Sequence, residues 1–179
     1  MSRLQTIDPS VATGKAKKLL DDVKAKLGLV PNMTKVMVNS PSVLEAYLGF
    51  SGALAGGHLD PKLREKLALV TAQQNRCEYC LSAHTAVGKM IGISQEQILA
   101  GRQGNGVDAR ETSALSFAKR MLDTSGQITE SDLTAVRAAG FSDGDIAEII
   151  AHVALNVFTN YFNTSTDVDI DFPKVSYTM

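Results

Sequence analysis

The sequence lacks an excess of charge of either sign. Its 18 lysine and arginine residues nearly balance 19 aspartate and glutamate residues, which gives a net charge of −1. Such a balance provides no electrostatic footprint for nucleic acid or for an anionic membrane surface. We therefore expect no nucleic-acid partner and no membrane partner.

Long apolar runs are also missing. The first residues, MSRLQTIDPS, lack the apolar core of a signal peptide, and no segment approaches the roughly 18 uncharged apolar residues of a membrane span. The glycine-rich stretches GALAGG and RQGNG follow no predicted strand and do not match a phosphate-binding loop, so no cofactor is expected. These features favour a cytoplasmic location, where thiols stay reduced.

Turn signals separate segments of helical periodicity along almost the whole chain. Asp8-Pro9, Ser40-Pro41 and Asp60-Pro61 predict helix starts, because a proline in the first turn loses no hydrogen bond. Further starts are predicted at Pro31-Asn32, Glu78 and Asp108, and by the capping pairs Ser94/Gln97, Thr129/Asp132 and Ser142/Asp145. The predicted fold is an all-α helical bundle.

This bundle is expected to be a single domain over residues 1–179. Helical halves 1–101 and 108–179 could be joined by the linker RQGNGVD. The first helix is predicted to run from Asp8 to Gly28, and the last to about Asn163. The apolar positions predicted to keep one face of the third helix buried are Val43, Leu44, Tyr47, Leu48 and Leu54.

Both cysteines of the chain lie in the stretch CEYCLSAH, residues 77–84. Cys77 and Cys80 are one turn apart at a helix start and could close a disulfide with little backbone movement. The helix N-terminus lowers the pKa of a thiol, which favours Cys77 as the nucleophile. His84, one turn after Cys80, would instead accept the proton of Cys80. The residues alone leave the choice between the two cysteines open.

Glu65 lies on the preceding helix, twelve residues before Cys77, among mostly apolar neighbours. A carboxylate there needs a polar partner, and His84 would supply one, so that Glu65, His84 and Cys80 would form a nucleophile with an oriented base. Two other interpretations stay open. The cysteines could be small buried apolar residues, or Cys77, Cys80 and His84 could bind zinc with Glu65 or His58. His58 is otherwise expected to be a solvated loop residue.

A polar stripe interrupts the last, apolar helix. His152 shares a face with Asn156, Thr159, Asn160 and Asn163 at steps of three or four residues. The pattern predicts buried hydrogen bonds, within the chain or across a subunit boundary. A catalytic part for His152 stays open.

Glu65 followed by CEYCLSAH resembles the active-site signature of the alkylhydroperoxidase D (AhpD) family, within the carboxymuconolactone decarboxylase-like superfamily. The segments DPKLREKLALVTA, GKMIGIS, ETSALSFAKRML and the NVFTNYFN-to-DFP ending extend the resemblance to the peroxidase-related branch. It implies an AhpD-like fold and a thiol-dependent peroxidase that reduces hydroperoxides. By position, Cys80 corresponds to the attacking thiol, Cys77 to the resolving thiol, His84 to the base and Glu65 to the proton relay; no metal ligand is implied.

The resemblance also implies an external dithiol reductant and a homo-oligomer, a trimer or a hexamer, whose candidate contacts are the apolar faces of residues 41–56 and 143–163. Tyr79 departs from the pattern, because well-known members carry a histidine directly before the second cysteine. Tyrosine can donate a hydrogen bond but, with a reference pKa of about 10, is a poor proton shuttle at neutral pH. We therefore expect slower turnover or a different substrate. A decarboxylase-like lyase without thiol cycling and a non-catalytic redox sensor are the alternatives.

Overall fold

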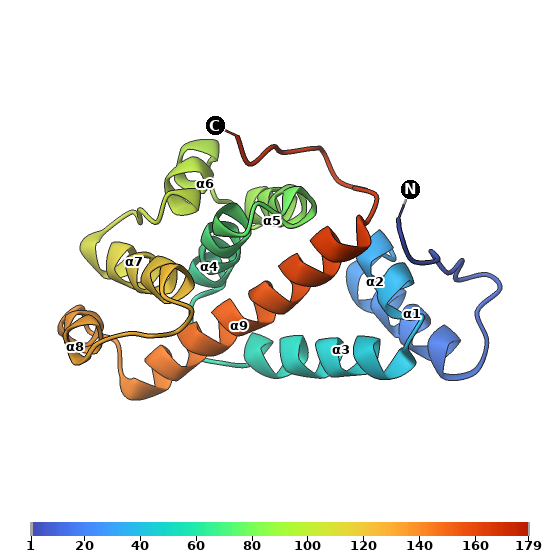
Figure 1. Cartoon of the computed structure of the whole chain (residues 1–179), viewed down its shortest axis with the longest axis horizontal. Helices are drawn as coiled ribbons and strands as arrows, with labels where there is room; N and C mark the ends of the chain where they lie inside the picture. Colours follow the sequence, from blue (N-terminus) through green and yellow to red (C-terminus); the bar gives the residue numbers. More distant parts are fainter. Residues whose placement is uncertain (1, 179) are drawn as a thin grey trace.

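The computed structural model describes residues 2–178, and within this range the chain forms nine α-helices and no strand, which confirms the all-α fold. The helices are α1 (Gly14–Leu27), α2 (Asn32–Met37), α3 (Pro41–Ala55), α4 (Pro61–Gln74), α5 (Glu78–Met90), α6 (Gln95–Arg102), α7 (Ala109–Asp123), α8 (Glu130–Ala138) and α9 (Asp143–Thr166). In Figure 1, α9 crosses the molecule diagonally, with α3 below it and α4 and α5 above it. None of the helices within residues 2–178 is both long and apolar enough to cross a membrane.

Most helices begin where the sequence predicts. The Ser94, Thr129 and Ser142 side chains each accept a hydrogen bond from the third residue of their helix, and each of the three starts is a complete capping box. At the start of α4, the Asp60 carboxylate accepts from the backbone N–H groups of Lys62 and Leu63. These local bonds satisfy donors that a helix leaves unpaired, which is why short sequence signals predict the starts.

The predicted start of the first helix at Asp8 is wrong, because α1 begins only at Gly14. The Asp8 carboxylate accepts the N–H of Ser10 at 2.8 Å and so forms a turn. Gly14 has a φ of 57°, in the left-handed region, and this backbone conformation separates the turn from the helix.

The third helix is less buried than its apolar sequence predicts. Only Leu44 of α3 is fully buried, whereas Val43, Tyr47 and Leu48 are half-buried and Phe50 is 40% exposed. The helix packs along α9 and against α1 and α2, so it covers one side of the bundle rather than entering its centre.

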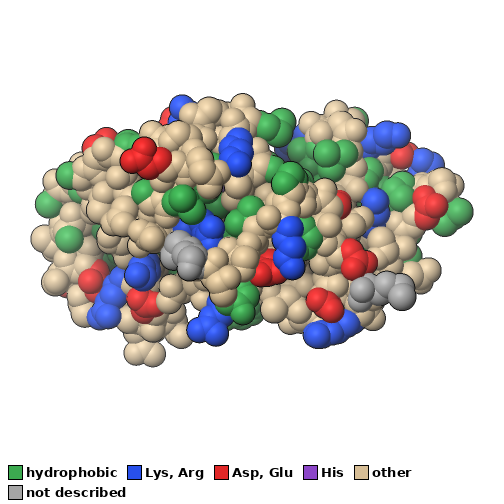
Figure 2. Space-filling view, turned by 90° about the horizontal axis from the view of Figure 1, so that it is seen from above, with side chains coloured by type: hydrophobic (Ala, Val, Ile, Leu, Met, Phe, Trp, Pro, Cys, Tyr) green, Lys and Arg blue, Asp and Glu red, His purple; other side chains and the backbone are tan. Residues whose placement is uncertain are grey.

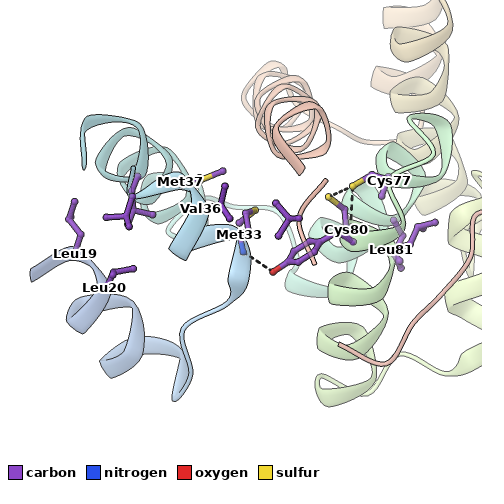
Figure 3. Close-up of a cluster of buried hydrophobic side chains, with 14 of the residues drawn as sticks. Leu19, Leu20, Met33, Val36, Met37, Cys77, Cys80 and Leu81 are labelled. Carbon is purple, nitrogen blue, oxygen red and sulfur yellow. Dashed lines mark hydrogen bonds between the residues drawn. The ribbon is translucent and has the colours of Figure 1, made fainter. Parts of the chain in front are cut away.

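Helix α4 lies at the centre, in contact with α5, α6, α7 and α9. One apolar cluster joins α1, α2, α3 and α5 with part of α4, and it includes Cys77 and Cys80 (Figure 3). A second cluster joins α4 with α7, α8 and α9. The outer surface is mixed in charge: on the face in Figure 2, basic and acidic side chains are interspersed.

The segment after α9 contains no helix or strand up to residue 178, as expected, but it packs on the bundle. Val168 is buried, and the Phe172 ring meets the Tyr79 ring edge-on with 5.8 Å between the centroids. The Val175 N–H donates to the Ser82 hydroxyl on α5 at 2.9 Å. Figure 1 shows this tail passing over α5 toward α6.

Candidate functional site

Side chains from α3, α4, α5 and α9 converge on a cavity of about 420 Å³. Glu65 reaches it from α4, and Tyr79, Cys80 and His84 reach it from α5. Cys77 lies at the N-cap of α5 and does not line the cavity. The structure therefore brings four of the five predicted site residues to one cavity and places the fifth directly behind Cys80.

The two cysteine sulfurs lie 2.6 Å apart and are not bonded to each other. The Cys80 backbone N–H donates to the Cys77 sulfur at 3.3 Å, so Cys77 acts as the N-cap of its own helix (Figure 3). Cys77 is 2% exposed and Cys80 is 3% exposed. A small molecule in the cavity would reach Cys80, and Cys77 would be reached through Cys80.

The thiol pair is electrostatically asymmetric. The hydrogen bond from the Cys80 thiol lowers the pKa of Cys77 to about 7, against the effect of burial and with help from the Cys80 backbone N–H. Burial and the neighbouring Cys77 sulfur raise the pKa of Cys80. Two groups this close titrate as a unit, so the negative charge of the singly deprotonated pair can pass from one sulfur to the other when a proton moves between them.

His84 is paired with Glu65 at the cavity wall. The His84 Nδ1–H donates to the Glu65 carboxylate at 2.8 Å, and the side chains are 26% and 21% exposed. Burial alone would lower the pKa of His84, but the Glu65 charge and hydrogen bond raise it. No hydrogen bond joins the His84 ring to either sulfur among the described residues. Cys80 and His84 both line the cavity, so a molecule bound there can contact both side chains.

The Tyr79 hydroxyl bonds to the backbone of α2. Its oxygen accepts the N–H of Met33 at 3.1 Å, and burial raises the pKa of this phenol above its ordinary value. Tyr79 thus stays neutral at physiological pH and fixes α2 against α5.

The polar stripe of α9 faces this site. All five of its side chains are buried, with exposures of 7% for His152, 6% for Asn156, 6% for Thr159, 0% for Asn160 and 2% for Asn163. The prediction of buried hydrogen bonds within the chain is confirmed for part of the stripe: Asn156 donates to the His152 carbonyl, and Thr159 donates to the Asn156 carbonyl. Three buried atoms of the stripe have no partner among the described residues: His152 Nε2, Asn160 Nδ2 and Asn163 Oδ1.

Asn163 is a site residue that sequence reasoning did not identify as one. Its amide N–H donates to the Cys80 sulfur at 3.2 Å and lies at the same distance from the Met33 sulfur. A donor here favours negative charge on Cys80 and lowers its pKa, against the larger effect of burial. The sequence signal was the stripe itself, but periodicity does not reveal which helix the stripe faces.

His58 lies apart from the site. It is exposed in the turn between α3 and α4, and its backbone N–H donates to the Glu148 carboxylate of α9. Within residues 2–178, no three histidine, cysteine, aspartate or glutamate side chains are grouped so that they could hold a metal ion.

Comparisons with known sequences find one family model that matches the part of the chain carrying the site residues of α4 and α5. Residues 41–120 match the model of the carboxymuconolactone decarboxylase family. A stretch of 45 residues, 25% of the chain, is 49% identical to an uncharacterized protein of Haemophilus influenzae, and it covers 40% of that relative.

Solved structures share the fold over almost the whole chain. An uncharacterized peroxidase-related protein from a Silicibacter species is 27% identical, with a TM-score of 0.80 and coverage of 94% of both chains. The AhpD core of a peroxidase-related protein from Ralstonia eutropha has a TM-score of 0.85 at 23% identity, covering 95% of this chain and 92% of its own. The debrominase Bmp8 in complex with 2,3,4-tribromopyrrole has a TM-score of 0.78 at 20% identity, covering 95% and 90%. The last two show the fold alone.

Proposed function

We propose that this chain is a thiol-dependent oxidoreductase of the AhpD-like, carboxymuconolactone decarboxylase superfamily and that it reduces hydroperoxides. The observation that carries the proposal is the position of Cys80. Its sulfur faces the cavity with a second thiol 2.6 Å behind it and with the His84–Glu65 pair on the same cavity wall.

The first step is an attack on the peroxide by Cys80. Cys80 passes its proton to the Cys77 thiolate, and the resulting Cys80 thiolate attacks the terminal oxygen of the hydroperoxide. An S–O bond forms, the O–O bond breaks, and the alkoxide leaves with the electron pair. The Nε2 proton of the protonated His84 goes to this alkoxide, because Nδ1 is already bonded to Glu65. The products are a sulfenic acid on Cys80 and an alcohol.

The second step closes the disulfide. Cys77 attacks the Cys80 sulfenic sulfur, the S–O bond breaks, and the leaving hydroxide takes the Cys77 proton as water. The sulfurs start 2.6 Å apart, so little movement is needed. An external dithiol then reduces the disulfide by exchange and is itself oxidised to a disulfide. Asn163 supports the first step, since its amide donates to the sulfur that must carry the charge.

The test is a thiol count with intact mass, before and after one equivalent of tert-butyl hydroperoxide. Reduced wild-type protein should lose both thiols and two hydrogens of mass. The Cys77→Ser variant should form a sulfenic acid on Cys80 more slowly than wild type, because Cys77 no longer takes the Cys80 proton, and should stop at this acid, which dimedone traps, because no resolving thiol remains. The Cys80→Ser variant should consume no peroxide.

Two outcomes would contradict the proposal. Wild-type thiols that do not react with the peroxide would exclude the peroxidase cycle. A trapped sulfenic acid on Cys77 in the Cys80→Ser variant, formed at the wild-type rate, would reverse the roles of the two cysteines. A decarboxylase-like lyase, the alternative reaction, would keep its activity in Cys80→Ser, since that reaction needs no thiol cycling.

A further inference from the structure

The cavity in front of Cys80 is far larger and more apolar than hydrogen peroxide requires. Its volume of about 420 Å³ lies in the range of pockets that hold organic ligands of substantial size. Apolar walls come from several elements, among them Leu27, Met33, Val87, Leu155 and Phe172. Apolar walls favour an organic chain or ring over a small polar peroxide.

His152 carries an unused polar atom in this cavity. The side chain lines the cavity and is 7% exposed, and its Nε2 has no hydrogen-bond partner among the described residues. A buried polar atom without a partner is unfavourable, so such an atom in a ligand cavity indicates a missing ligand group. Burial and the nearby Arg64 charge lower the pKa of His152, so the ring is neutral at pH 7 and can donate one N–H.

Arg64 supplies a positive charge at the same end of the cavity. Its Nη1 group donates to the Leu54 and Ala55 carbonyls at 3.1 and 2.8 Å, which fixes the half-buried guanidinium at the C-terminal end of α3. An arginine has five N–H donors, and these two bonds leave the Nε and Nη2 donors for another acceptor. Arg64 forms no ion pair with a carboxylate within residues 2–178. The neighbouring carboxylate, Glu65, is bonded to His84 instead.

Helix α9 lines both this cationic end of the cavity and the thiol end. His152 lies eleven residues before Asn163, which contacts the Cys80 sulfur, and the rise of 1.5 Å per helical residue makes this about 16 Å. We propose that the cavity binds an elongated organic acid hydroperoxide, with its carboxylate on Arg64 and His152 and its O–O group between Cys80 and His84. The placement of the peroxide group rests on the proposed function, whereas the placement of the carboxylate is argued from the residues of the cavity alone.

The test measures acid recognition without any peroxide. Isothermal titration calorimetry compares decanoate with 1-decanol, which has the same chain and a neutral head, on reduced wild-type protein. We expect decanoate to bind about tenfold or more tightly than 1-decanol, as for a carboxylate with a charge-assisted pair. Bound decanoate should also slow the alkylation of Cys80 by iodoacetamide in a Cys77→Ser background.

Variants of Arg64 and His152 test where the carboxylate of decanoate binds. Arg64→Gln should reduce decanoate affinity about tenfold and bring it close to that of 1-decanol, and His152→Phe should reduce it by a smaller factor. The matched control is Arg120→Gln, at a half-exposed arginine of α7 outside the cavity, which should bind decanoate as wild type does.

Equal affinities of the wild type for decanoate and 1-decanol would overturn the inference, and this result does not depend on whether any variant folds. A preference for decanoate that persists in Arg64→Gln would also overturn it. Failure of the proposed function has a different signature: decanoate would bind and depend on Arg64, but the thiols would not react with tert-butyl hydroperoxide.

Discussion

At the scale of single residues, the proton on His84 is controlled by one carboxylate. Burial disfavours the imidazolium, and the Glu65 charge and hydrogen bond outweigh burial, so the pKa of His84 is raised. A raised pKa favours the protonated form of His84, which can give its proton to a developing alkoxide. Glu65 is thus a positioning residue, since it acts on the substrate only through His84.

Replacing Glu65 by Gln should lower the pKa of His84, because the largest charge that opposes the effect of burial is then removed. We expect a roughly 10- to 100-fold loss in kcat/KM for hydroperoxide at pH 7 and an alkaline limb of the pH–rate profile that moves to lower pH. NMR titration of His84 should show its midpoint shifted in the same direction. Glu96→Gln, at an exposed position of α6, is the control and should change neither quantity.

The pairing of His84 with Glu65 should also make the unfolding free energy of the protein depend on pH. A pKa that is raised on folding stabilises the protein fully below the unfolded value of about 6.5, and this contribution is lost as pH rises through the folded pKa. Over the range in which Glu65 is charged, the difference in unfolding free energy between wild type and Glu65→Gln should therefore be largest below about pH 6.5 and should shrink as the pH rises above this value. A difference that grows with pH would contradict the proposed pairing.

Residue patterns identified part of the site, and tertiary contacts supplied the rest. The Cys77, Cys80 and His84 positions share one helix, so spacing alone predicted their proximity. The contact between Asn163 and Cys80 joins residues 83 positions apart, and no local rule predicts such a contact. The sequence also left the choice of nucleophile open, and exposure to the cavity, which depends on the packing of several helices, now favours Cys80.

At the scale of helices, a buried ion pair fixes α4 to α7. The Lys66 ammonium lies 2.7 Å from the Glu111 carboxylate, with side-chain exposures of 3% and 12%. The same carboxylate accepts the Val107 N–H, so it also holds the linker before α7. This pair positions α4, the helix that presents Glu65 and Arg64 to the cavity.

Removing one partner of this pair should be costly, because the other charge stays buried. We expect Lys66→Met to lower the unfolding free energy by about 3 kcal/mol, and the double variant Lys66→Met/Glu111→Leu to cost less than Lys66→Met alone. Denaturant unfolding measures both. The control is Lys15→Met, which breaks an equally short pair whose side chains are 52% and 56% exposed and should change stability by less than about 1 kcal/mol. A single-variant cost as small as the control's would show that the buried pair does not hold α4 in place.

Helix boundaries were predictable where a cap is local. Ser94, Thr129 and Ser142 are examples, because each cap bond spans three residues. The predicted helix start at Asp8 was wrong because an aspartate that caps a helix and an aspartate that forms a turn have the same sequence signal. The prediction that one face of α3 is buried was wrong for another reason: apolar periodicity predicts that a helix face makes a contact but not whether residues of this chain cover that face.

At the scale of the whole molecule, the two ends of the chain close around the end of α9. The Arg3 N–H donates to the Thr166 carbonyl at 2.7 Å, and the Ser2 N–H donates to the Asp169 carboxylate at 3.3 Å. The tail then crosses α5 and places Phe172 at the cavity (Figure 1). The cavity is therefore lined by two parts of the chain that lie far apart in the sequence, residues 27–91 and 152–172.

The last seven residues of the chain should hold this tail in place. The Arg102 guanidinium donates to the Ser176 carbonyl at 2.7 Å, Gln73 donates to the Tyr177 carbonyl at 2.9 Å, and the Val175 N–H donates to Ser82. Deleting residues 173–179 removes these bonds and leaves the Arg102 guanidinium without one acceptor. At about 1 kcal/mol per bond the cost is roughly 3 kcal/mol, which corresponds to a Tm lower by about 6–12 °C for a chain of this size.

The same deletion should loosen Phe172 against Tyr79 and so open the cavity. We expect iodoacetamide to alkylate Cys80 faster in the truncated protein, measured in a Cys77→Ser background below the transition temperature of both forms. Lys174→Ala is the matched control, because it removes only an ion pair between Glu78 and a lysine that is 69% exposed, and it should shift stability by less than about 1 kcal/mol. A truncated protein with the Tm and the alkylation rate of the full chain would mean that Phe172 is held at the cavity by the packing of residues 168–172 alone, without the bonds that follow it.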